Sequence, residues 1–311
     1  MRYRSIPIEE IDLEDHTFVI SFGFDLTPLK ASIDLLGIIN PPTLRQKDPR
    51  SYQVVTGYKR LLCARELGLA RVSCLILPPL IDDLCALMIV LHENLCGRGL
   101  NLVEKAHLTL RFLDYLPEEE VLKGILPALG FKPHPRNLEF LRTVAFLELP
   151  LKEALAQGRL NENIVPDLLQ LSEEERQAVF ELFKKISPSY SRQREILEML
   201  RDLAQIEDHP VHEIITSPEA NQILTSDLSP KERGERFFYW LKRRRYPRLS
   251  ELEERFMDFC RRLKSPGIRI KPPPAFESDE CTLSLSFRNM DDLENKWRQF
   301  AQCLKGNQES R

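Results

Sequence analysis

The segment from Thr56 to Arg60 has the residue types and spacing that suit anion binding. Thr56 and Gly57 follow an apolar run, and Lys59 and Arg60 open the next amphipathic stretch. A strand that turns at a glycine into a helix leaves free backbone N–H groups at the helix N-terminus, where the helix dipole also favours phosphate. Arg60 can add a forked grip on the same anion. The alternative is a routine strand–turn–helix whose cations face water.

A second candidate segment lies further along the chain. Glu93 and Asn94 end a helical apolar pattern, and Arg98 stands between two glycines. Carboxylate and carboxamide oxygens are suitable Mg²⁺ ligands, usually shared with the phosphates of a substrate. Asn101 and Glu104 then have the spacing of a capping box that begins another helix. The alternative is a solvated helix end followed by a loop.

Short helices and strands in the first hundred residues must position both segments. Thr27 and Pro28 predict a helix start, with Thr27 as N-cap, and Leu29, Ile33 and Leu36 form its apolar stripe. The pattern predicts helices over 27–36, 59–67 and 82–92 and strands over 43–45, 52–55 and 72–77. Because two prolines precede the strand at 43–45, we expect it at a sheet edge.

Composition places the chain among globular proteins with more than one domain. It has 311 residues, of which 42% are hydrophobic and 29% charged, and a net charge of −3 that argues against a general polyanion binder. The most apolar stretch, 74–91, is interrupted by prolines and aspartates, so no membrane span is expected. Seven cysteines without a Cys-x-x-Cys pair, and no apolar signal core, indicate a reduced, cytoplasmic compartment.

Charge is unevenly distributed along the chain. Residues 1–100 carry a net charge of −1, residues 101–230 carry −8, and residues 231–311 carry +6. The first part alternates strands and helices, the part from 101 to 206 has helical periodicity throughout, and the last part mixes helix, a proline-rich link and a strand. A basic C-terminal part is a weak indication of a polyanionic partner.

The order of these segments resembles the ParB family of chromosome and plasmid partition proteins, whose N-terminal domain is of the ParB/sulfiredoxin type. The resemblance runs from about Ile6 to Lys105 and continues more weakly to about residue 206. It implies an α+β fold in three parts: a ParB/sulfiredoxin-like nucleotide-binding domain over 1–100, an all-helical domain derived from a helix-turn-helix over 101–206, and a small, basic α/β C-terminal region over 207–311.

The resemblance also implies a ligand, because ParB N-terminal domains bind CTP with Mg²⁺ and use it to close a clamp on DNA. The phosphate-holding Gly-x-Arg-Arg segment of the family matches Gly57, Lys59 and Arg60, and its Glu-Asn pair matches Glu93 and Asn94. The implied nucleotide contacts are Thr56, Gly57, Lys59, Arg60, Asn94 and Arg98. Glu93 and Asn94 are the implied Mg²⁺ ligands, and Glu93 is the candidate catalytic residue. Asn101 and Glu104 match further family positions and are expected to act structurally.

Several positions depart from the family pattern. Leu62 and Gly97 stand where the family has arginines, with Arg98 one place later. The residues from Phe18 to Phe22 replace a family segment whose glutamine contributes to hydrolysis. Nucleotide hydrolysis, at most a weak CTPase activity, therefore stays open. Tyr58 occupies the position of the sulfiredoxin cysteine, which argues against sulfinic acid reduction.

Two regions are candidates for DNA contact. The resemblance places a helix-turn-helix over 119–129 and 136–147, where Arg136, Asn137 and Arg142 could meet bases or phosphates. The −8 charge of this block opposes phosphate binding, and a helical scaffold is the alternative. Lys242, Arg243, Arg244 and Arg245 follow an aromatic run and suit non-specific backbone contact, with a solvated basic helix face as the alternative.

The remaining C-terminal pattern predicts a strand over 282–287, which could pair with 267–271 as a hairpin, and a helix over 291–304. Leu293, Trp297 and Phe300 share one side of that helix. Such a unit could form a homodimer.

The sequence therefore predicts a cytoplasmic, nucleoid-associated prokaryotic ParB-like protein. In this hypothesis CTP or another nucleoside triphosphate with Mg²⁺ switches its association with DNA, in partition or transcription-related regulation. Two other classes stay open, namely a ParB-fold phosphotransferase or nuclease and a scaffold with a degenerate pocket that binds protein partners only.

Overall fold

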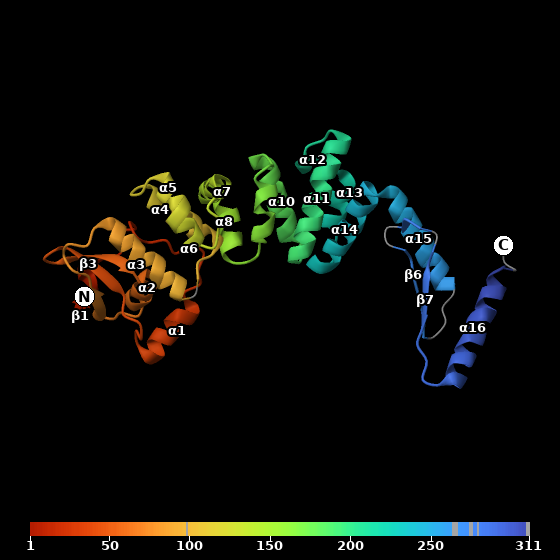
Figure 1. The fold of residues 1–311 in the computed structure, drawn as a ribbon, viewed down its shortest axis with the longest axis horizontal. Coiled ribbons are helices and arrows are strands. Elements are labelled where there is room, and N and C mark those ends of the chain that lie inside the picture. The colour runs from red at the N-terminus through yellow and green to blue at the C-terminus, as the bar shows by residue number, and fades with distance from the viewer. Residues whose placement is uncertain (98, 263–266, 274–275, 279, 309–311) are drawn as a thin grey trace. The chain divides into compact units, whose positions relative to one another are not determined.

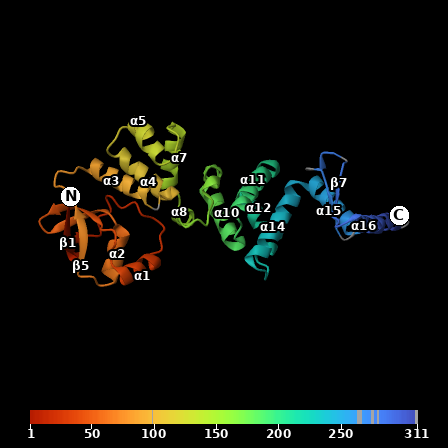
Figure 2. The same cartoon turned by 60° about the horizontal axis from the view of Figure 1, so that its bottom comes forward.

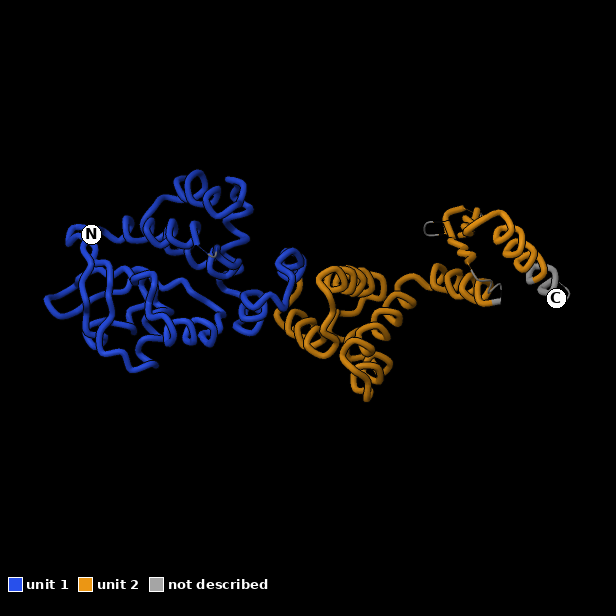
Figure 3. The backbone as a smooth tube through the Cα atoms, turned by 90° about the horizontal axis from the view of Figure 1, so that it is seen from below, with its two compact units in different colours: residues 1–170 blue, residues 171–311 orange. Residues whose placement is uncertain are grey.

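The computed structural model describes residues 1–97, 99–262, 267–273, 276–278 and 280–308. Residues 1–170 form one compact unit and residues 171–311 a second (Figure 3). The three-part division expected from the sequence, with boundaries after residues 100 and 206, stays a prediction. Arg98, one of the expected nucleotide contacts, lies outside the described residues.

A five-stranded mixed sheet organises the N-terminal part of the first unit (Figure 1). The strand order is β1-β5-β3-β4-β2. β1 pairs with β5 and β3 with β4 in antiparallel fashion, whereas β3 with β5 and β2 with β4 are parallel. The strands are β1 Arg2–Pro7, β2 Ile11–Asp12, β3 Thr43–Asp48, β4 Ser51–Thr56 and β5 Arg71–Ile76.

The prediction that 43–45 forms an edge strand is wrong, because β3 is the central strand of the sheet. The two prolines precede β3 instead of interrupting it, so the strand keeps its N–H groups for pairing on both sides. The carbonyl of Pro42 accepts a hydrogen bond from the Leu75 N–H at 2.8 Å, which anchors the approach to the strand.

The helices of the first unit confirm most of the predicted elements. They are α1 Thr27–Leu36, α2 Tyr58–Glu66, α3 Asp83–Cys96, α4 Leu102–Leu113, α5 Glu118–Glu120, α6 Leu126–Ala128, α7 Pro135–Ala145, α8 Leu149–Ala156 and α9 Val165–Leu168, with 3-10 turns at Ile8–Glu10 and Glu162–Ile164 and a π-helical turn at Val121–Ile125.

Three details of these helices differ from expectation. α1 begins at Thr27 with Leu26 as its N-cap, and its apolar stripe is shorter than predicted, because Ile33 is buried whereas Leu36 is 64% exposed. α3 continues to Cys96 instead of ending at His92, so Glu93 and Asn94 lie in its last turn. No proline or glycine precedes Gly97 to stop the helix earlier.

A core between the sheet and α2 holds the first part of the unit together. Leu44 and Val54 from the central strands pack with Leu61 and Ala64 of α2, and all four are at most 1% exposed. Burial of a leucine contributes about 1.5–3 kcal/mol, so these contacts fix where β4 ends and α2 begins. α3 packs against β4 as well.

The segment between β2 and α1 has little regular structure, but partly buried polar contacts anchor its start. The Asp15 carboxylate accepts hydrogen bonds from Thr17 N at 2.9 Å, from Gln53 Nε2 at 2.8 Å and from the Lys47 ammonium. Burial by itself raises the pKa of Asp15, but the hydrogen bonds from Lys47, Thr17 and Gln53 outweigh it. The pKa therefore lies well below its usual range, and Asp15 is held as a carboxylate.

The same segment is anchored further on by the start of α4. Glu104 is fully buried and accepts hydrogen bonds from Phe22 N at 3.2 Å and from Asn101 N at 3.1 Å. Asn101 Oδ1 accepts in turn from Glu104 N, which completes the predicted capping box. The expectation that this pair acts structurally is thus confirmed, since it caps α4 and holds the backbone of Phe22.

The second unit consists mainly of helices (Figures 1 and 2). They are α10 Glu173–Ile186, α11 Tyr190–Glu207, α12 Val211–Thr216, α13 Pro218–Leu224, α14 Pro230–Arg245, α15 Pro247–Arg262 and α16 Met290–Gln308. α14 packs against both α10 and α11. Apolar residues recur at helical spacing in α10 and α11, and they are buried, at Val179, Leu182, Phe183, Ile196, Leu197, Leu200 and Leu203.

The end of the chain contains the predicted hairpin. β6 Ile268–Lys271 pairs with β7 Thr282–Leu285 in antiparallel register. On α16, Phe300 is 4% exposed whereas Trp297 is 54% exposed, so the expected apolar side is only partly covered. Among the residues that the structure describes, no helix is both long and apolar enough to cross a membrane.

Candidate functional site

One cavity of the first unit brings the two candidate segments together. It encloses about 760 Å³ and is lined by Thr56, Gly57, Lys59 and Arg60 at the junction of β4 and α2 and by Glu93 and Asn94 in the last turn of α3. Its remaining walls come from Phe18, Val19, Ile20, Ser21, Leu29, Asn40, Pro41, Val55, Tyr58, Val90, Cys96 and Gly97. This volume lies in the range of small-molecule sites.

The turn at Gly57 creates the cationic side of the cavity. Gly57 has φ 83°, and a Cβ built on it would lie 2.9 Å from Pro42 Cα, so only glycine fits without strain. α2 has no side-chain N-cap, and its first intrahelical hydrogen bond runs from Leu61 N to Gly57 O at 3.2 Å. The helix therefore points its N-terminal N–H groups and its positive dipole end toward the cavity, as anion binding requires.

An ion pair joins the two candidate segments directly. Arg60 Nη2 donates to Glu93 Oε1 at 2.7 Å, and Arg60 Nη1 donates to the carbonyls of Asn40 and Pro41, the latter at 3.4 Å. The Arg60 side chain is 19% exposed and that of Glu93 is 39% exposed. The guanidinium is thus held at the cavity wall with its charge partly shielded from water.

Other side chains of the cavity are held by local contacts. The Lys59 ammonium lies 3.9 Å from the centre of the Phe24 ring. This cation–π contact attaches α2 to the segment between β2 and α1. The Tyr58 hydroxyl is 3.1 Å from His16 Nε2. Thr56 is 6% exposed, and its hydroxyl has no hydrogen-bond partner among the described residues.

The donor set fits a magnesium ion that is shared with phosphates. Asn94 Nδ2 donates to Val90 O at 2.8 Å, which leaves Oδ1 as the side-chain atom for a ligand, and Glu93 adds carboxylate oxygens. Within the described residues no group of three or more His, Cys, Asp or Glu could hold a metal ion. Two protein oxygens plus phosphates and water match the usual magnesium shell, whereas a site built from protein ligands alone does not fit.

Sequence reasoning missed the contribution of two segments to this cavity. Phe18, Ile20 and Ser21 form one wall, and Asn40 and Pro41 approach Arg60 through their carbonyls. Residues 18–22 stood out only as a departure from a family pattern. The proline pair after Asn40 signalled a turn but gave no indication of a contact with Arg60.

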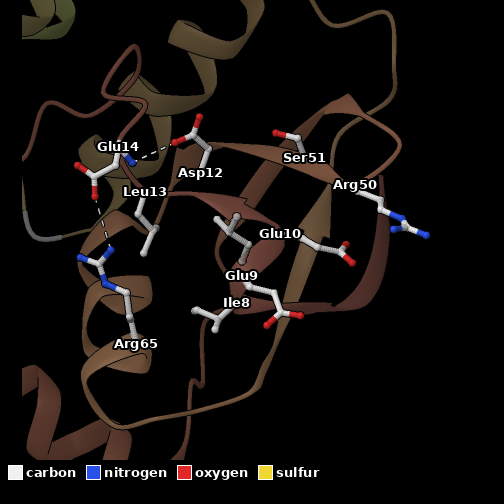
Figure 4. Close-up of a pocket in the computed structure, with 10 residues that line it drawn as sticks. Ile8, Glu9, Glu10, Asp12, Leu13, Glu14, Arg50, Ser51 and Arg65 are labelled. Carbon is white, nitrogen blue, oxygen red and sulfur yellow. Dashed lines mark hydrogen bonds and ion pairs between the residues drawn. The ribbon is translucent and has the colours of Figure 1, made fainter.

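A second cavity, of about 560 Å³, lies between the 3-10 turn after β1, β2 and the end of α2 (Figure 4). Glu14 forms an ion pair with Arg65 across 3.6 Å, and its N–H donates to Asp12 Oδ1 at 3.1 Å. Glu9, Glu10 and Arg50 also line it. None of the predicted site residues lies there.

Comparison with known proteins identifies the N-terminal domain. The ParB N-terminal domain family matches residues 3–95, which include both segments of the cavity. The N-terminal part of the chain therefore carries a ParB N-terminal domain. The recognition from sequence and the α+β fold class are therefore confirmed.

Curated ParB-family relatives match different lengths of this chain. A probable chromosome-partitioning protein ParB of Vibrio cholerae serotype O1 is 36% identical over 87 residues, which cover 26% of this chain and only 29% of that protein. A nucleoid occlusion protein of Listeria monocytogenes serotype 4a is 25% identical over 223 residues, which cover 69% of this chain and 75% of that protein.

Solved ParB structures are similar at a lower level. C-terminally truncated ParB of Caulobacter crescentus complexed with CTP-gamma-S is 22% identical and covers 58% of this chain and 98% of that chain, with a TM-score of 0.29. The same protein complexed to the centromeric parS site is 20% identical and covers 63% and 98%, with a TM-score of 0.36.

The ParB-type DNA candidates on α7 are engaged within the first unit. Asn137 Nδ2 donates to Lys132 O at 2.9 Å. Arg142 forms ion pairs with Glu118 at 2.8 Å and with Glu139 at 3.5 Å. Arg136 lies in the first turn of α7, and none of these residues lines either of the two cavities. Their role in DNA contact stays a prediction.

The basic cluster at the end of α14 is paired with acidic residues inside the second unit. Arg244 and Glu207 form a two-pronged contact at 2.7 and 2.6 Å, and Arg245 contacts Asp202 at 2.9 Å. Lys242 and Arg243 pair with Glu253 at 2.7 Å and Glu254 at 3.4 Å. These carboxylates reduce the positive charge available for a DNA backbone. The DNA role of this cluster also stays a prediction.

Proposed function

We propose that this ParB-family chain binds a nucleoside triphosphate, CTP in the first place, together with Mg²⁺ in the cavity between β4, α2 and α3. Binding would act as a switch on DNA association in chromosome partition or nucleoid occlusion. The observation that carries the proposal is that Gly57–Arg60 and Glu93–Asn94 line one cavity and are joined by the Arg60–Glu93 ion pair. The Caulobacter ParB complexed with CTP-gamma-S names the ligand to test first.

The cavity offers each part of a nucleotide a suitable environment. The N-terminus of α2 and Arg60 would face the phosphates, and Glu93 and Asn94 would hold a magnesium ion, which would neutralise phosphate charge. Apolar side chains on the other walls, including Phe18, Ile20 and Val55, suit a nucleoside. We assign Lys59 to the same phosphate end, next to Arg60.

A path of contacts links the cavity wall to the helical part of the first unit. Phe22 follows the wall residues, and its ring lies edge-on to His107 at 5.6 Å and 5.9 Å from the Lys152 ammonium. A Cβ built on Gly23 would lie 2.3 Å from Ala156 Cβ in α8, so the chain passes close to that helix. A ligand that moves residues 18–22 therefore acts on α4 and α8, which is the physical basis of the proposed switch.

Hydrolysis is not part of the proposal. Glu93 is the one candidate catalytic carboxylate, and its Oε1 is already bound to Arg60. We assign it to the metal and to charge balance instead of general base catalysis.

DNA and a second copy of the chain are the proposed macromolecular partners. Caulobacter ParB complexed to parS is the reason to test a specific DNA site. Among the described residues, β6 and β7 form a two-stranded sheet with no further strand at either edge, and Phe287, Met290 and Trp297 nearby in sequence are at least half exposed. Open edges and exposed apolar side chains suit self-association.

The test is calorimetric titration of the full chain with CTP, ATP, GTP and UTP in Mg²⁺, each with and without duplex DNA. The proposal predicts selective CTP binding that changes with DNA. Selective binding of another nucleotide with turnover would favour a phosphotransferase. No binding of any nucleotide would refute the proposal and leave the scaffold hypothesis.

A further inference from the structure

We propose that the Arg60–Glu93 ion pair makes this cavity selective for a metal-complexed polyphosphate over a free polyphosphate anion. The inference rests on the proposed nucleotide function and adds to it, since it assigns to Glu93 a role in excluding ligands that arrive without a metal. In this role Glu93 is a specificity-determining residue.

The Arg60 guanidinium is already paired within the protein. Glu93 Oε1 occupies Arg60 Nη2 at 2.7 Å, and the carbonyls of Asn40 and Pro41 occupy Nη1. A free phosphate that binds Arg60 must take the guanidinium from Glu93. The Glu93 carboxylate then has no positive partner and lies in the same cavity as the negative charges of the phosphate. Both effects weaken the binding of a metal-free anion.

A divalent cation removes both penalties. Glu93 and its neighbour Asn94 present oxygen atoms to the cavity, and these are ligands that Mg²⁺ accepts. When Glu93 binds the metal, its charge is balanced and the guanidinium of Arg60 is released for phosphate. Glu93 would thus leave Arg60 and bind the metal, and Arg60 would leave Glu93 and bind the phosphate. Each charge would have a partner both before and after the exchange.

Partial shielding of the pair from water makes this exchange measurable. The Arg60 side chain is 19% exposed and Glu93 is 39% exposed, so their attraction is less screened than that of a pair on the open surface. A charge-assisted hydrogen bond of this kind changes affinity by roughly 10- to 100-fold when it is fully buried. Partial exposure reduces the expected change to roughly 5- to 10-fold.

The test is calorimetric titration of the full chain with inorganic tripolyphosphate and with CTP, in Mg²⁺ and in EDTA. Glu93→Gln keeps the size of the side chain and removes its charge. Glu66→Gln is the matched control, because Glu66 loses the same charge in the same unit. It pairs with Lys30 at a similar 2.8 Å, with side-chain exposures of 49% and 39%, and does not line the cavity.

We expect Glu93→Gln to bind metal-free tripolyphosphate roughly 5- to 10-fold more tightly than wild type, and to gain little affinity on addition of Mg²⁺. Glu66→Gln should behave as wild type in both buffers. Circular dichroism melting checks that each variant is folded, and Glu93→Ala, which removes the same charge, should change metal-free affinity in the same direction.

The outcomes separate the two proposals. If wild type binds Mg·CTP but neither Glu93 variant binds metal-free tripolyphosphate more tightly than wild type, the selectivity role of Glu93 is refuted and the nucleotide site remains. If Glu66→Gln tightens metal-free binding as much as Glu93→Gln, overall charge and not the ion pair is responsible, and the inference again fails. If wild type binds neither ligand in either buffer, both proposals fail.

Discussion

Replacement of Thr56 by valine tests the cavity through two opposite effects. Thr56 is 6% exposed, and its buried hydroxyl has no hydrogen-bond partner among the described residues. An unpaired buried hydroxyl costs about 1–3 kcal/mol, and valine has nearly the same shape without it. Thr56→Val should therefore raise the free energy of unfolding by about 1 kcal/mol, or the melting temperature by roughly 2–4 °C for a unit of this size.

The same variant should weaken nucleotide binding. Thr56 adjoins Gly57 and lines the cavity, so in the proposed complex a bound phosphate would supply the acceptor that its hydroxyl lacks. Loss of a hydrogen bond to a charged group costs about 1.5–3 kcal/mol, which corresponds to roughly 10- to 150-fold in Kd. Thr56→Ser keeps the hydroxyl and loses a methyl group. It should bind Mg·CTP as wild type does and lose about 0.5–1.5 kcal/mol of stability.

Thermal melting by circular dichroism and titration with Mg·CTP, on the same preparations, measure both effects. The reasoning about the unpaired hydroxyl is refuted if Thr56→Val melts below wild type. The assignment of the hydroxyl to the ligand is refuted if Thr56→Val is stable and binds Mg·CTP with unchanged Kd. A weaker affinity for CTP with unchanged affinity for tripolyphosphate would move the contact from the phosphates to the nucleoside.

Three further predictions concern stability. Gly57→Ala should lower the free energy of unfolding by about 2–3 kcal/mol, because a Cβ there meets the backbone of Pro42 at 2.9 Å. Gly68→Ala is the control, since Gly68 also has positive φ but open space around it, and should cost about 1 kcal/mol. Equal losses in urea unfolding would contradict this prediction. Hydrogen bonds hold the pKa of Asp15 below its usual 3.8, so the stability that its carboxylate contributes is present above that pH and is lost as the pH falls below it. The difference in stability between wild type and Asp15→Asn should therefore shrink from pH 7 to about pH 3. A difference that stays constant in thermal melts at both pH values would refute this prediction. Arg244→Ala should lower the free energy of unfolding by about 1 kcal/mol, because its two-pronged contact is partly buried. Arg243 has a side chain that is 71% exposed, so Arg243→Ala should lower it by about 0.3 kcal/mol or less. The reverse order in thermal melts would contradict this ranking of the two ion pairs.

Local patterns in the sequence predicted most elements but not how they are arranged. Apolar spacing predicted α2 and the helical character of residues 101–206, and the capping box at Asn101 marked the start of α4 correctly. The prolines before β3 suggested an edge strand because proline is rare inside a sheet, yet they lie outside the strand and leave its pairing intact. Whether a strand is central depends on β5, which follows much later in the chain.

In the candidate site, too, local features could be predicted from the sequence, whereas contacts between distant segments could not. The turn at Gly57 was predicted because it is a local arrangement of residue types, and Glu93 and Asn94 were selected for their side-chain oxygens. Their role as Mg²⁺ ligands stays a prediction. The contact of Arg60 with Glu93 joins residues from two helices, and no periodicity indicates it. The acidic partners of the basic cluster on α14 were missed for a similar reason, since Glu207 and Asp202 lie on α11.

The most direct test of the account compares two arginines of α2. Arg60 lines the cavity, whereas Arg65 is half exposed, contacts Glu14 and lines the other cavity. In calorimetric titration of the full chain with CTP and Mg²⁺, Arg60→Ala should raise Kd roughly 10- to 100-fold, and Arg65→Ala should leave it unchanged. Equal affinities for wild type and Arg60→Ala would contradict the placement of the nucleotide at this site.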